Sequence, residues 1–560
     1  MIKLASVFSG IGAIEHALSR MELDKEIIFA CDNGEIDVFS KQIDLDMDQI
    51  EEELSSLRLL INNIEFSHDD GYETQLLDML SAAEDEYKKI KSSLDGVTID
   101  NYNENVSDIL NKILNTNDLK ENRVKVFTEF NDNLNSNFSS TQTKLYIYRV
   151  ILKLTNDFKR DNSLADLGQT DVEFASSVNI NWAEISKSLK IVYDIYEAEN
   201  GGKFIRSVRN LSQRIGQLHG KINSLGHLNK IKQLNYDDKK KYVDNLYNGK
   251  DKQNKVKMSY MANYDCDDDH FHWDASFLDG TQYKNQVDLF VGGSPCQSFS
   301  IVGKERGLSD TRGTLFYEYA RLVDEIQPKV FIYENVRAVL SYDCGKTWNK
   351  MKEVFIDLGY NVYYENEGKP SILNSKDYGI PQNRNRLFVV GFRKDIKLKQ
   401  DFEFPKPITL NYTMQDFLIE NAPCGSFLPK ENVNFIEMEN NFNVEDIDKY
   451  FLSEKIKKSI LSRGTKNFFS NPETDLDIAR PLLTTMHKMH RAGVDNYVTT
   501  DGRLRRLIPR ECLRLIGFSD EWKIVVSDTA MYQQAGNSIV VDVLIHIMEE
   551  IIKCYPELIE

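Results

Sequence analysis

Cysteine is scarce in this chain and follows no pairing or metal-binding pattern. Seven cysteines are scattered through 560 residues, and no two of them form a CxxC pair. In a large protein this distribution argues against a disulfide framework and a zinc site, and it favours a reducing compartment. We therefore expect a cytoplasmic protein without a bound metal.

Long apolar runs are lacking as well. No stretch approaches the ~20 apolar residues that a membrane span needs, and Met1–Leu4 begins a strand-like segment and not a signal peptide. The hydrophobic fraction of 41% and the aromatic fraction of 11% are nevertheless ordinary for a folded enzyme. We expect neither a membrane partner nor wholesale disorder.

Positive charge is in deficit. The chain has 69 Lys and Arg against 87 Asp and Glu, a formal net charge of -18, which taken alone argues against binding to phosphates. The charge is unevenly distributed, however. Residues 41–100 contain 16 acidic and 5 basic side chains, whereas residues 201–250 contain 3 acidic and 11 basic ones. A local basic face, and with it a nucleic-acid partner, remains compatible with the sequence.

The order of strand-like and helix-like segments predicts an α/β fold. Residues 1–40 indicate a strand, a glycine turn, a helix to about Met21 and a second strand, which is typical of a doubly wound sheet. Later strand-like runs alternate with helix-like runs and predict βαβ units with a parallel sheet. The strands are expected at Val287–Val291, Val330–Tyr333 and Leu387–Gly391, and the helices at Phe316–Glu325, Trp348–Leu358 and within Pro509–Ile552.

Residues 45–260 are polar and contain three apolar stripes with alternating spacings of 3 and 4. This spacing predicts helices packed in coiled-coil fashion, either in an ordinary bundle or in an extended arm. We expect the first, acidic helix to pack against the last, basic one. The stripes are Ile50, Leu54, Leu57, Ile61 and Ile64; Leu76, Leu80, Ala83, Tyr87, Ile90 and Leu94; and Val208, Leu211, Ile215, Leu218, Ile222 and Leu225.

Three reactive side-chain types follow or precede the predicted strands. Cys296 comes directly after one strand, where a ligand would bind and a nucleophile could act, although a lone cysteine is more often structural. Glu334 ends the next strand, and Arg384 and Arg386 stand at the start of a third. If that start is extended, the period of two directs both guanidinium groups the same way. Together these residues suggest a nucleophile, an acid and a cationic anchor.

Seven segments in the same order resemble the motifs of the C5-cytosine-specific DNA methyltransferase family. The resemblance covers residues 1–40 and about 265–555, whereas residues 45–260 resemble no segment of the family. The segments are Phe8–Ala13, Ser294–Gln297, Asp310–Phe316, Glu334–Val336, Gln382–Arg386, Arg506–Cys512 with Gly517 and Phe518, and Gln534–Ser538.

The resemblance implies a Rossmann-like methyltransferase domain that uses S-adenosyl-L-methionine (AdoMet), a smaller target-recognition domain and a large, mainly α-helical insertion. The implied boundaries are 1–44 and 261–395 for the two parts of the catalytic domain, 45–260 for the insertion, 396–500 for target recognition and 501–560 for a segment that returns to the catalytic domain.

The resemblance also implies a mechanism on a cytosine flipped out of the duplex. The thiolate of Cys296 would add to C6, Glu334 would neutralise charge at N3, and Arg386 with Arg384 would hold O2 of the base. The stretch from Ser298 to Gly313 resembles the family's mobile loop that closes over the flipped base.

AdoMet is the cofactor that the resemblance implies. Asp32 would accept from the ribose hydroxyls and Asp274 from the adenine amino group. Asn33 stands where family members often carry a stacking aromatic, and Glu35 is an alternative acid. The implied contact residues are Phe8, Gly10, Ile11, Gly12, Ala13, Asp32, Asn33, Asp274, Ala275, Gly293, Pro295, Leu315, Asn537, Ser538 and Val540.

The expected substrate is a specific sequence of double-stranded DNA, bound by a monomer. Gln297, Ser298 and Ser300 would meet DNA beside the nucleophile, and Lys488, His490 and Arg491 would read bases or contact phosphates. Lys239–Lys241 could add phosphate contacts, or the insertion could serve protein partners or stability alone. A cognate restriction endonuclease acting on the same site is left open.

Two other functions fit parts of the pattern: a tRNA cytosine-5 methyltransferase, and a non-catalytic DNA-binding protein on the same scaffold. The long region 396–500 favours DNA over tRNA, because reading a groove requires surface. The presence of Cys296, Glu334 and Arg386 counts against a non-catalytic protein.

Overall fold

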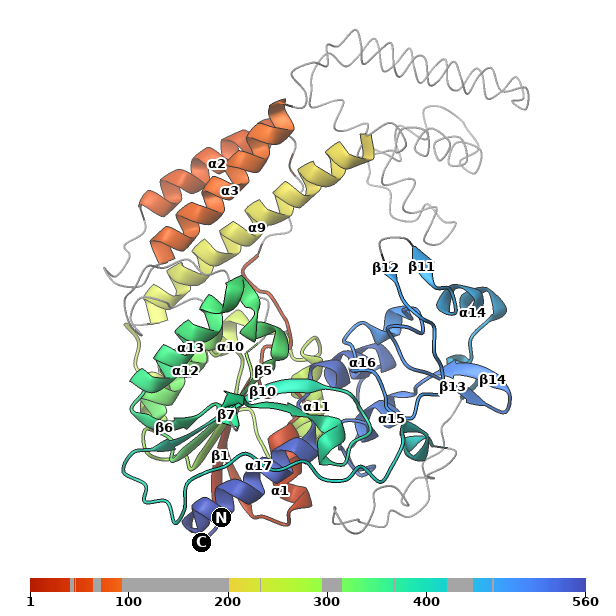
Figure 1. Cartoon of the computed structure of the whole chain (residues 1–560). Helices are drawn as coiled ribbons and strands as arrows, with labels where there is room; N and C mark the ends of the chain where they lie inside the picture. Colours follow the sequence, from red (N-terminus) through yellow and green to blue (C-terminus); the bar gives the residue numbers. More distant parts are fainter. Residues whose placement is uncertain are drawn as a thin grey trace, which may run out of the picture. The chain divides into compact units, whose positions relative to one another are not determined.

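The computed structural model describes two compact units of the chain (Figure 1). The first unit contains residues 1–37 and 230–560, and the second contains the described helices between residues 38 and 229. The described residues are 1–40, 45, 47–63, 72–92, 201–231, 233–294, 315–366, 368–419, 447–465 and 468–560.

An eight-stranded sheet forms the centre of the first unit. Its strands follow the order β3-β2-β1-β4-β5-β10-β6, and β9 pairs with β10. β1, β2, β3, β4 and β5 are parallel to one another. The strands are β1 (Ile2–Val7), β2 (Lys25–Cys31), β3 (Phe271–His272), β4 (Leu289–Gly292), β5 (Val330–Val336), β6 (Tyr360–Tyr363), β9 (Ile372–Asn374) and β10 (Asn385–Arg393). The doubly wound α/β fold predicted from the sequence is confirmed.

One strand departs from the predicted parallel sheet. β10 runs antiparallel to β5, to β6 and to β9, and its residue Arg386 pairs with Val336 while Phe388 pairs with Glu334. The first residues of β10 therefore lie at the carboxyl end of β5. In an all-parallel sheet, Arg386 and Glu334 would lie at opposite edges.

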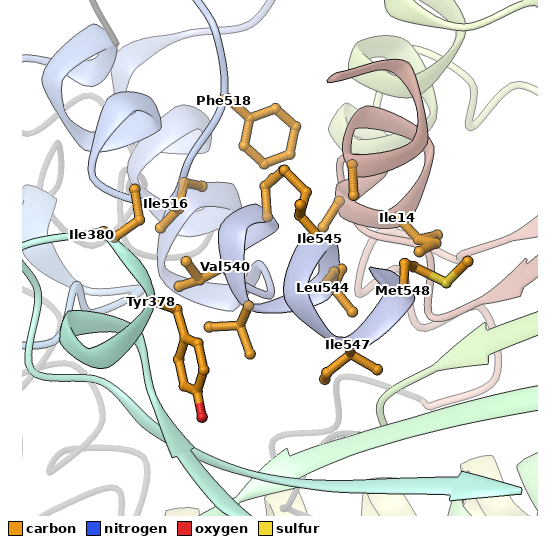
Figure 2. Close-up of a cluster of buried hydrophobic side chains, with 14 of the residues drawn as sticks. Ile14, Tyr378, Ile380, Ile516, Phe518, Val540, Leu544, Ile545, Ile547 and Met548 are labelled. Atoms are coloured by element: carbon orange, nitrogen blue, oxygen red, sulfur yellow. The ribbon is translucent and has the colours of Figure 1, made fainter. Parts of the chain in front are cut away.

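Helices cover both faces of the sheet. On one face, apolar side chains of α12 (Leu315–Ile326) and α13 (Lys346–Asp357) pack in one buried cluster with the strands. On the other face, α1 (Ala13–Arg20) and α17 (Val541–Cys554) belong to a second cluster. Figure 2 shows Leu544 and Met548 of α17 near Ile14 of α1, within this second cluster.

Shorter elements complete the first unit. The helices are α10 (Tyr236–Leu246), α11 (Lys255–Asn263), α14 (Glu454–Ile460), α15 (Pro509–Arg514) and α16 (Asp528–Asn537). The two-stranded pairs are β7 (Glu365–Asn366) with β8 (Lys369–Pro370), β11 (Gly464–Thr465) with β12 (Phe468–Phe469), and β13 (Tyr497–Thr500) with β14 (Arg503–Arg506).

Three helices of the second unit pack through the apolar stripes that the sequence predicts. They are α2 (Met47–Asn62), α3 (Tyr72–Ser92) and α9 (Gly201–Ile231), whose last two residues belong to the first unit. All the predicted stripe residues form one buried cluster, except Ile64 and Leu94, which lie outside the described residues. Polar contacts flank the cluster, including a hydrogen bond of 2.6 Å between Glu53 of α2 and His219 of α9. The predicted packing of the acidic helix against the basic one is confirmed.

The boundaries of the helical part differ from the predicted 45–260. Residues 230–260, including α10 and most of α11, pack in the first unit. Asn254 donates to the carbonyl of Asp32 after β2, and Tyr260 packs against Ala30 and Phe271 of the sheet and donates to Glu15 of α1. None of the helices in the described ranges combines the length and apolar character that crossing a membrane requires. Within those ranges, no group of three or more His, Cys, Asp or Glu side chains is placed to hold a metal ion.

Candidate active site

A glycine turn follows β1 and leads into α1. Phe8, Gly10 and Gly12 all have left-handed backbone conformations, with φ of 53°, 54° and 77°. The backbone N–H and the hydroxyl of Ser9 donate to the carbonyl of Cys31, at 3.3 and 3.0 Å, and this ties the turn to the end of β2. A Cβ at Gly12 would lie 2.2 Å from the Tyr264 ring, so only glycine fits there.

Asp32 lies at the carboxyl end of β2 and helps to shape this turn. Its carboxylate accepts the backbone N–H of Gly10 at 2.9 Å and that of Gly34 at 2.8 Å. Burial raises the pKa of Asp32, and these two hydrogen bonds oppose the rise. Asn33 uses its side-chain oxygen within the same loop, where it accepts the N–H of Glu35 at 3.0 Å.

Asp274 lies just beyond β3, the strand that pairs with β2. Its carboxylate accepts the N–H of Ser276 at 2.9 Å and the hydroxyl of Tyr247 at 3.1 Å. Burial raises the pKa of Asp274. The glycine turn, Asp32 and Asp274 therefore follow three adjacent parallel strands at one edge of the sheet, where doubly wound folds bind ligands.

The end of β4 contacts the end of β5. A Cβ at Gly293 would lie 2.8 Å from Oε2 of Glu334, so the absence of a side chain lets the two strand ends approach closely. Ser294 is buried, with its hydroxyl 2.6 Å from that of Tyr333, and its carbonyl accepts from Asn335 at 3.2 Å. These contacts fix the point at which the chain leaves the sheet toward residue 295.

Glu334 and Arg386 form an ion pair at this position. Nε of Arg386 lies 2.9 Å from Oε1 of Glu334, and their side chains are 19% and 13% exposed. Burial raises the pKa of Glu334, whereas the charges of Arg386 and, less strongly, Arg384 lower it. The net direction is upward, which favours a protonated carboxyl group more than an exposed glutamate would.

Arg384 does not share the role of Arg386. Its guanidinium donates to the carbonyls of Leu482, Gly536 and Ser538 at 3.1, 2.9 and 2.9 Å, and its side chain is buried. Burial, followed by repulsion from Arg386, lowers the pKa of Arg384 to about 9. The expectation that both arginines hold the base is therefore corrected, because Arg384 is occupied in joining the start of β10 to two distant segments.

Comparison with known proteins gives matches to one family. The family model of the C-5 cytosine-specific DNA methylase matches residues 240–553, more than half of the 560 residues. The type II methyltransferase M.HhaI of Haemophilus parahaemolyticus is 34% identical over 267 residues, which cover 46% of this chain and 74% of that protein.

The chain belongs to the C-5 cytosine-specific DNA methylase family. Membership, together with the sheet topology, confirms the predicted methyltransferase fold and the enzyme class, DNA (cytosine-5-)-methyltransferase. The matched range begins at residue 240, and β1 with its glycine turn completes the same sheet beside β4.

Two further methyltransferases and one solved structure are also similar to the chain. The type II methyltransferase M.HpaII of Haemophilus parainfluenzae is 33% identical over 266 residues, covering 46% of this chain and 69% of that protein. The orphan methyltransferase M.SPRI of Bacillus phage SPR is 28% identical over 402 residues, covering 53% and 89%. The crystal structure of the S. pombe Dnmt2 methyltransferase has 16% sequence identity and a TM-score of 0.37, and the match covers 53% of this chain and 88% of that one.

Several family residues expected at the site are placed as follows. Ala13 begins α1, Leu315 begins α12, and Ala275 is buried beside Asp274. Asn537 ends α16 and donates to Glu35 at 3.2 Å, and Ser538 and Val540 are buried after it. Pro295, Cys296, Gln297, Ser298 and Ser300 lie outside the described residues.

The candidate DNA-reading segment of this methylase forms a tight turn. Lys488 is exposed, and Met489 after it has a φ of 54°. His490 has a local partner for its ring, the Thr485 hydroxyl at 2.8 Å, and its N–H donates to Asp495 at 2.8 Å. Arg491 is half-buried in the same turn. His490 is therefore engaged in shaping the turn, and Lys488 is the side chain that extends into solvent.

Three residues that contact the candidate cofactor elements (the glycine turn, Asp32 and Asp274) were not predicted from the sequence. Tyr247, Asn254 and Tyr264 contact Asp274, Asp32 and the glycine turn, respectively. They follow residue 33 by more than 200 positions and belong to no motif, so the sequence contained no signal that could have located them.

Proposed function

We propose that this methylase transfers the methyl group of AdoMet to C5 of a flipped-out cytosine in a specific double-stranded DNA sequence, through a covalent bond between Cys296 and C6. The Glu334–Arg386 pair is the observation that carries the proposal. It lies against Gly293, three residues before Cys296, so the acid and the cation stand where the chain enters the nucleophile's segment.

AdoMet fits the residues at the carboxyl ends of β1, β2 and β3. The glycine turn can bring backbone close to a bound molecule at Gly10, where an added Cβ would meet only the carbonyl of Phe8, at 4.0 Å. Asp32 and Asp274 offer carboxylate acceptors for hydroxyl and amino groups, and each oxygen keeps a second acceptor position beyond its observed bond. When bound, AdoMet supplies an electrophilic methyl group.

The protein's residues supply the remaining chemistry. C5 of cytosine is too weak a nucleophile to be methylated directly, and addition of the Cys296 thiolate at C6 makes it enamine-like. Glu334 delivers or shares a proton at N3, which neutralises the negative charge that this addition places on the ring. Arg386 orients the carboxyl group and binds O2 of the base. After transfer, a base removes the C5 proton and Cys296 leaves C6.

DNA binding is assigned to the region 396–500 together with the segment after Cys296. Lys488 is a candidate base or phosphate contact, because it is exposed. Arg491 is proposed as a second contact in the same turn. The proposed division into catalytic residues 1–44 and 261–395, target recognition in 396–500 and a returning segment 501–560 places one function on each part. Protection of a site from a cognate endonuclease would be one use of such an activity.

Covalent trapping tests this proposal. Duplex DNA with 5-fluorocytosine at the target should form an adduct stable to denaturing gels, only in the presence of AdoMet, because the fluorine cannot be removed as the C5 proton is. The target itself is found first, by bisulfite sequencing of DNA from a host that expresses the chain. Methylation of tRNA and not of duplex DNA would contradict the proposal. So would the absence of an adduct under conditions in which the enzyme methylates the unsubstituted target DNA.

A further inference from the structure

The segment from Tyr247 to Tyr264 contributes one side chain to each of three candidate cofactor elements. Asn254 donates to the carbonyl of Asp32 at 2.9 Å, and the hydroxyl of Tyr264 donates to the carbonyl of Gly12 at 2.8 Å. The hydroxyl of Tyr247 donates to Asp274 at 3.1 Å. This segment follows the helical unit after residues 230–246, which include α10, and lies far from residues 1–40 in the sequence.

Tyr247 is held firmly at the end of α10. It is 1% exposed, and its ring stacks on Trp273 with a centroid distance of 4.9 Å and an interplanar angle of 9°. Nζ of Lys257 in α11 lies over the Trp273 ring, 4.8 Å from a ring centroid of the indole. The stacking fixes the direction of the Tyr247 hydroxyl toward Asp274.

Asp274 is consequently held at both of its oxygens. Oδ1 accepts the N–H of Ser276 at 2.9 Å and Oδ2 accepts the Tyr247 hydroxyl. A carboxylate fixed in this way cannot rotate, and each oxygen keeps a further acceptor position. Asp274 is also one of the residues that line a crevice between α10 and residues 272–279.

We propose that Tyr247 is a positioning residue for cofactor specificity: its hydroxyl orients the Asp274 carboxylate to accept the amino group of the adenine ring. The inference rests on the proposed function, in which AdoMet is the cofactor. It adds a residue from outside the glycine turn and the strand ends, and it gives the segment after the helical unit a part in recognising the nucleoside. Preorganised acceptors discriminate strongly against analogues that lack the matching donor.

The test compares two ligands that differ at C6 of the ring, where a carbonyl replaces the amino group and N1 consequently carries a hydrogen. The full-length wild-type chain and Tyr247→Phe are titrated calorimetrically with S-adenosylhomocysteine and with S-inosylhomocysteine, whose ring has a carbonyl in place of the amino group. Tyr247→Phe keeps the stacking ring. We expect it to weaken binding of S-adenosylhomocysteine about fivefold to tenfold and to leave the inosine analogue within about twofold, so that the preference between the ligands falls.

Tyr378→Phe is the matched control. Tyr378 is 2% exposed and donates to the carbonyl of Pro405 at 2.9 Å, so this variant loses an equally buried hydroxyl bond away from the cofactor elements. It should keep the wild-type preference. An unchanged or larger preference of Tyr247→Phe for S-adenosylhomocysteine would overturn the inference. A merely structural role would give an unchanged preference, because it would weaken the binding of both ligands alike.

Hydrogen–deuterium exchange on the wild-type chain gives a second measurement that needs no variant. Addition of S-adenosylhomocysteine should slow exchange at the end of α10, around Tyr247, and unchanged exchange there would overturn the inference. Wild-type protein that binds no S-adenosylhomocysteine at all would instead refute the cofactor assignment in the proposed function, and the inference with it. The two failures are thus distinguishable.

Discussion

At the scale of single residues, the proposed acid and the described end of the chain before Cys296 are fixed by different contacts. Glu334 lies within the regular β5 strand and is fixed by its ion pair with Arg386. The path toward Cys296 is fixed at Ser294, through its contacts with Tyr333 and Asn335. Variants of the two functional residues should accordingly affect chemistry and not folding.

Cys296→Ser should abolish methyl transfer and preserve AdoMet binding. A serine hydroxyl is a far weaker nucleophile than a thiolate near neutral pH, so we expect a loss of roughly a thousandfold or more, whereas the candidate cofactor residues are unchanged. Tritium transfer to DNA and calorimetry measure the two properties. Cys344→Ser, at an exposed free cysteine, is the control and should keep full activity. Normal transfer by Cys296→Ser would refute the covalent step.

The raised pKa of Glu334 predicts the sign of the pH dependence. If the protonated carboxyl group supports the reaction, activity declines as the pH rises through the pKa of the folded state, above the ordinary value of 4.5. Arg386→Met removes the cation that lowers this pKa. The decline should therefore move to higher pH, while the overall rate falls. Glu334→Gln should lower the rate by about 10²–10⁴-fold, and its activity should no longer show this decline with rising pH.

Arg393→Met, on the same strand β10, is the control for Arg386→Met. Arg393 pairs with Asp395 at 2.7 Å and is the last residue of β10, whereas Arg386 lies near its start. The pH profile of Arg393→Met should match that of the wild type. A decline that stays in place in Arg386→Met would show that another group controls it.

At the scale of elements, a buried ion pair connects the first and last long helices of the sheet-containing unit. Arg20 of α1 and Asp542 of α17 are 2.7 Å apart, with side chains 3% and 9% exposed, and Arg20 also donates to the carbonyl of Gly517. Asp542→Ala leaves a buried guanidinium without its carboxylate and should lower the free energy of unfolding by about 3–5 kcal/mol. Chemical denaturation measures this loss.

Glu550→Ala on the same helix is the matched control. The exposed Glu550–Lys553 pair, at 2.8 Å, should contribute less than about 1 kcal/mol, because solvent screens it. Equal destabilisation by the two substitutions would contradict the assignment of a special role to the buried pair.

The helical unit allows a comparison of two leucines on one helix. Leu57 of α2 is fully buried in the bundle, whereas Leu59 is 64% exposed. Leu57→Ala should destabilise the bundle by about 2–5 kcal/mol, and Leu59→Ala should have little effect. Hydrogen exchange of α2 and α3 peptides measures the opening of this unit. Similar exchange in both variants would contradict the bundle packing.

The elements that the sequence predicts well are those specified by local pattern. Short apolar runs located β1 and β5, which are buried on both faces, and helical patterns located α12 and the three stripes, because burial fixes both the pattern and the packing. The direction of β10 and the partners of Arg384 depend on contacts more than 40 residues away along the chain. No local pattern encodes such contacts, and the same is true of Tyr247 at the cofactor elements.

At the scale of the whole molecule, the structure narrows the expected role of the Lys239–Lys241 run. Lys239 pairs with Asp279, and Lys240 pairs with Asp244 at 2.9 Å, whereas Lys241 is exposed. Lysines already neutralised by carboxylates contribute little to the release of counterions. The predicted contribution of this run to DNA binding therefore falls to that of Lys241.

Salt-dependent binding to duplex DNA tests this revision. Lys241→Ala should lower the slope of log K against log salt by at most about one unit, and the double variant Lys239→Ala with Lys240→Ala should leave the slope unchanged. A larger change in the double variant would show that the two ion pairs open on binding. No change in Lys241→Ala would remove the run from the DNA interface.

The reversal of β10 also determines where this chain can change length during evolution. The meeting of Arg386 with Glu334 depends on the register between β5 and β10, and β6 and β9, which lie between these two strands in the chain, pair with β10 as well. The turns that join these elements can therefore gain or lose residues without displacing the pair. A single residue inserted between Arg386 and the middle of β10 would instead turn the guanidinium to the other face of the sheet, because side chains alternate along a strand. Family members should accordingly vary in the connection and keep a constant count inside the strand.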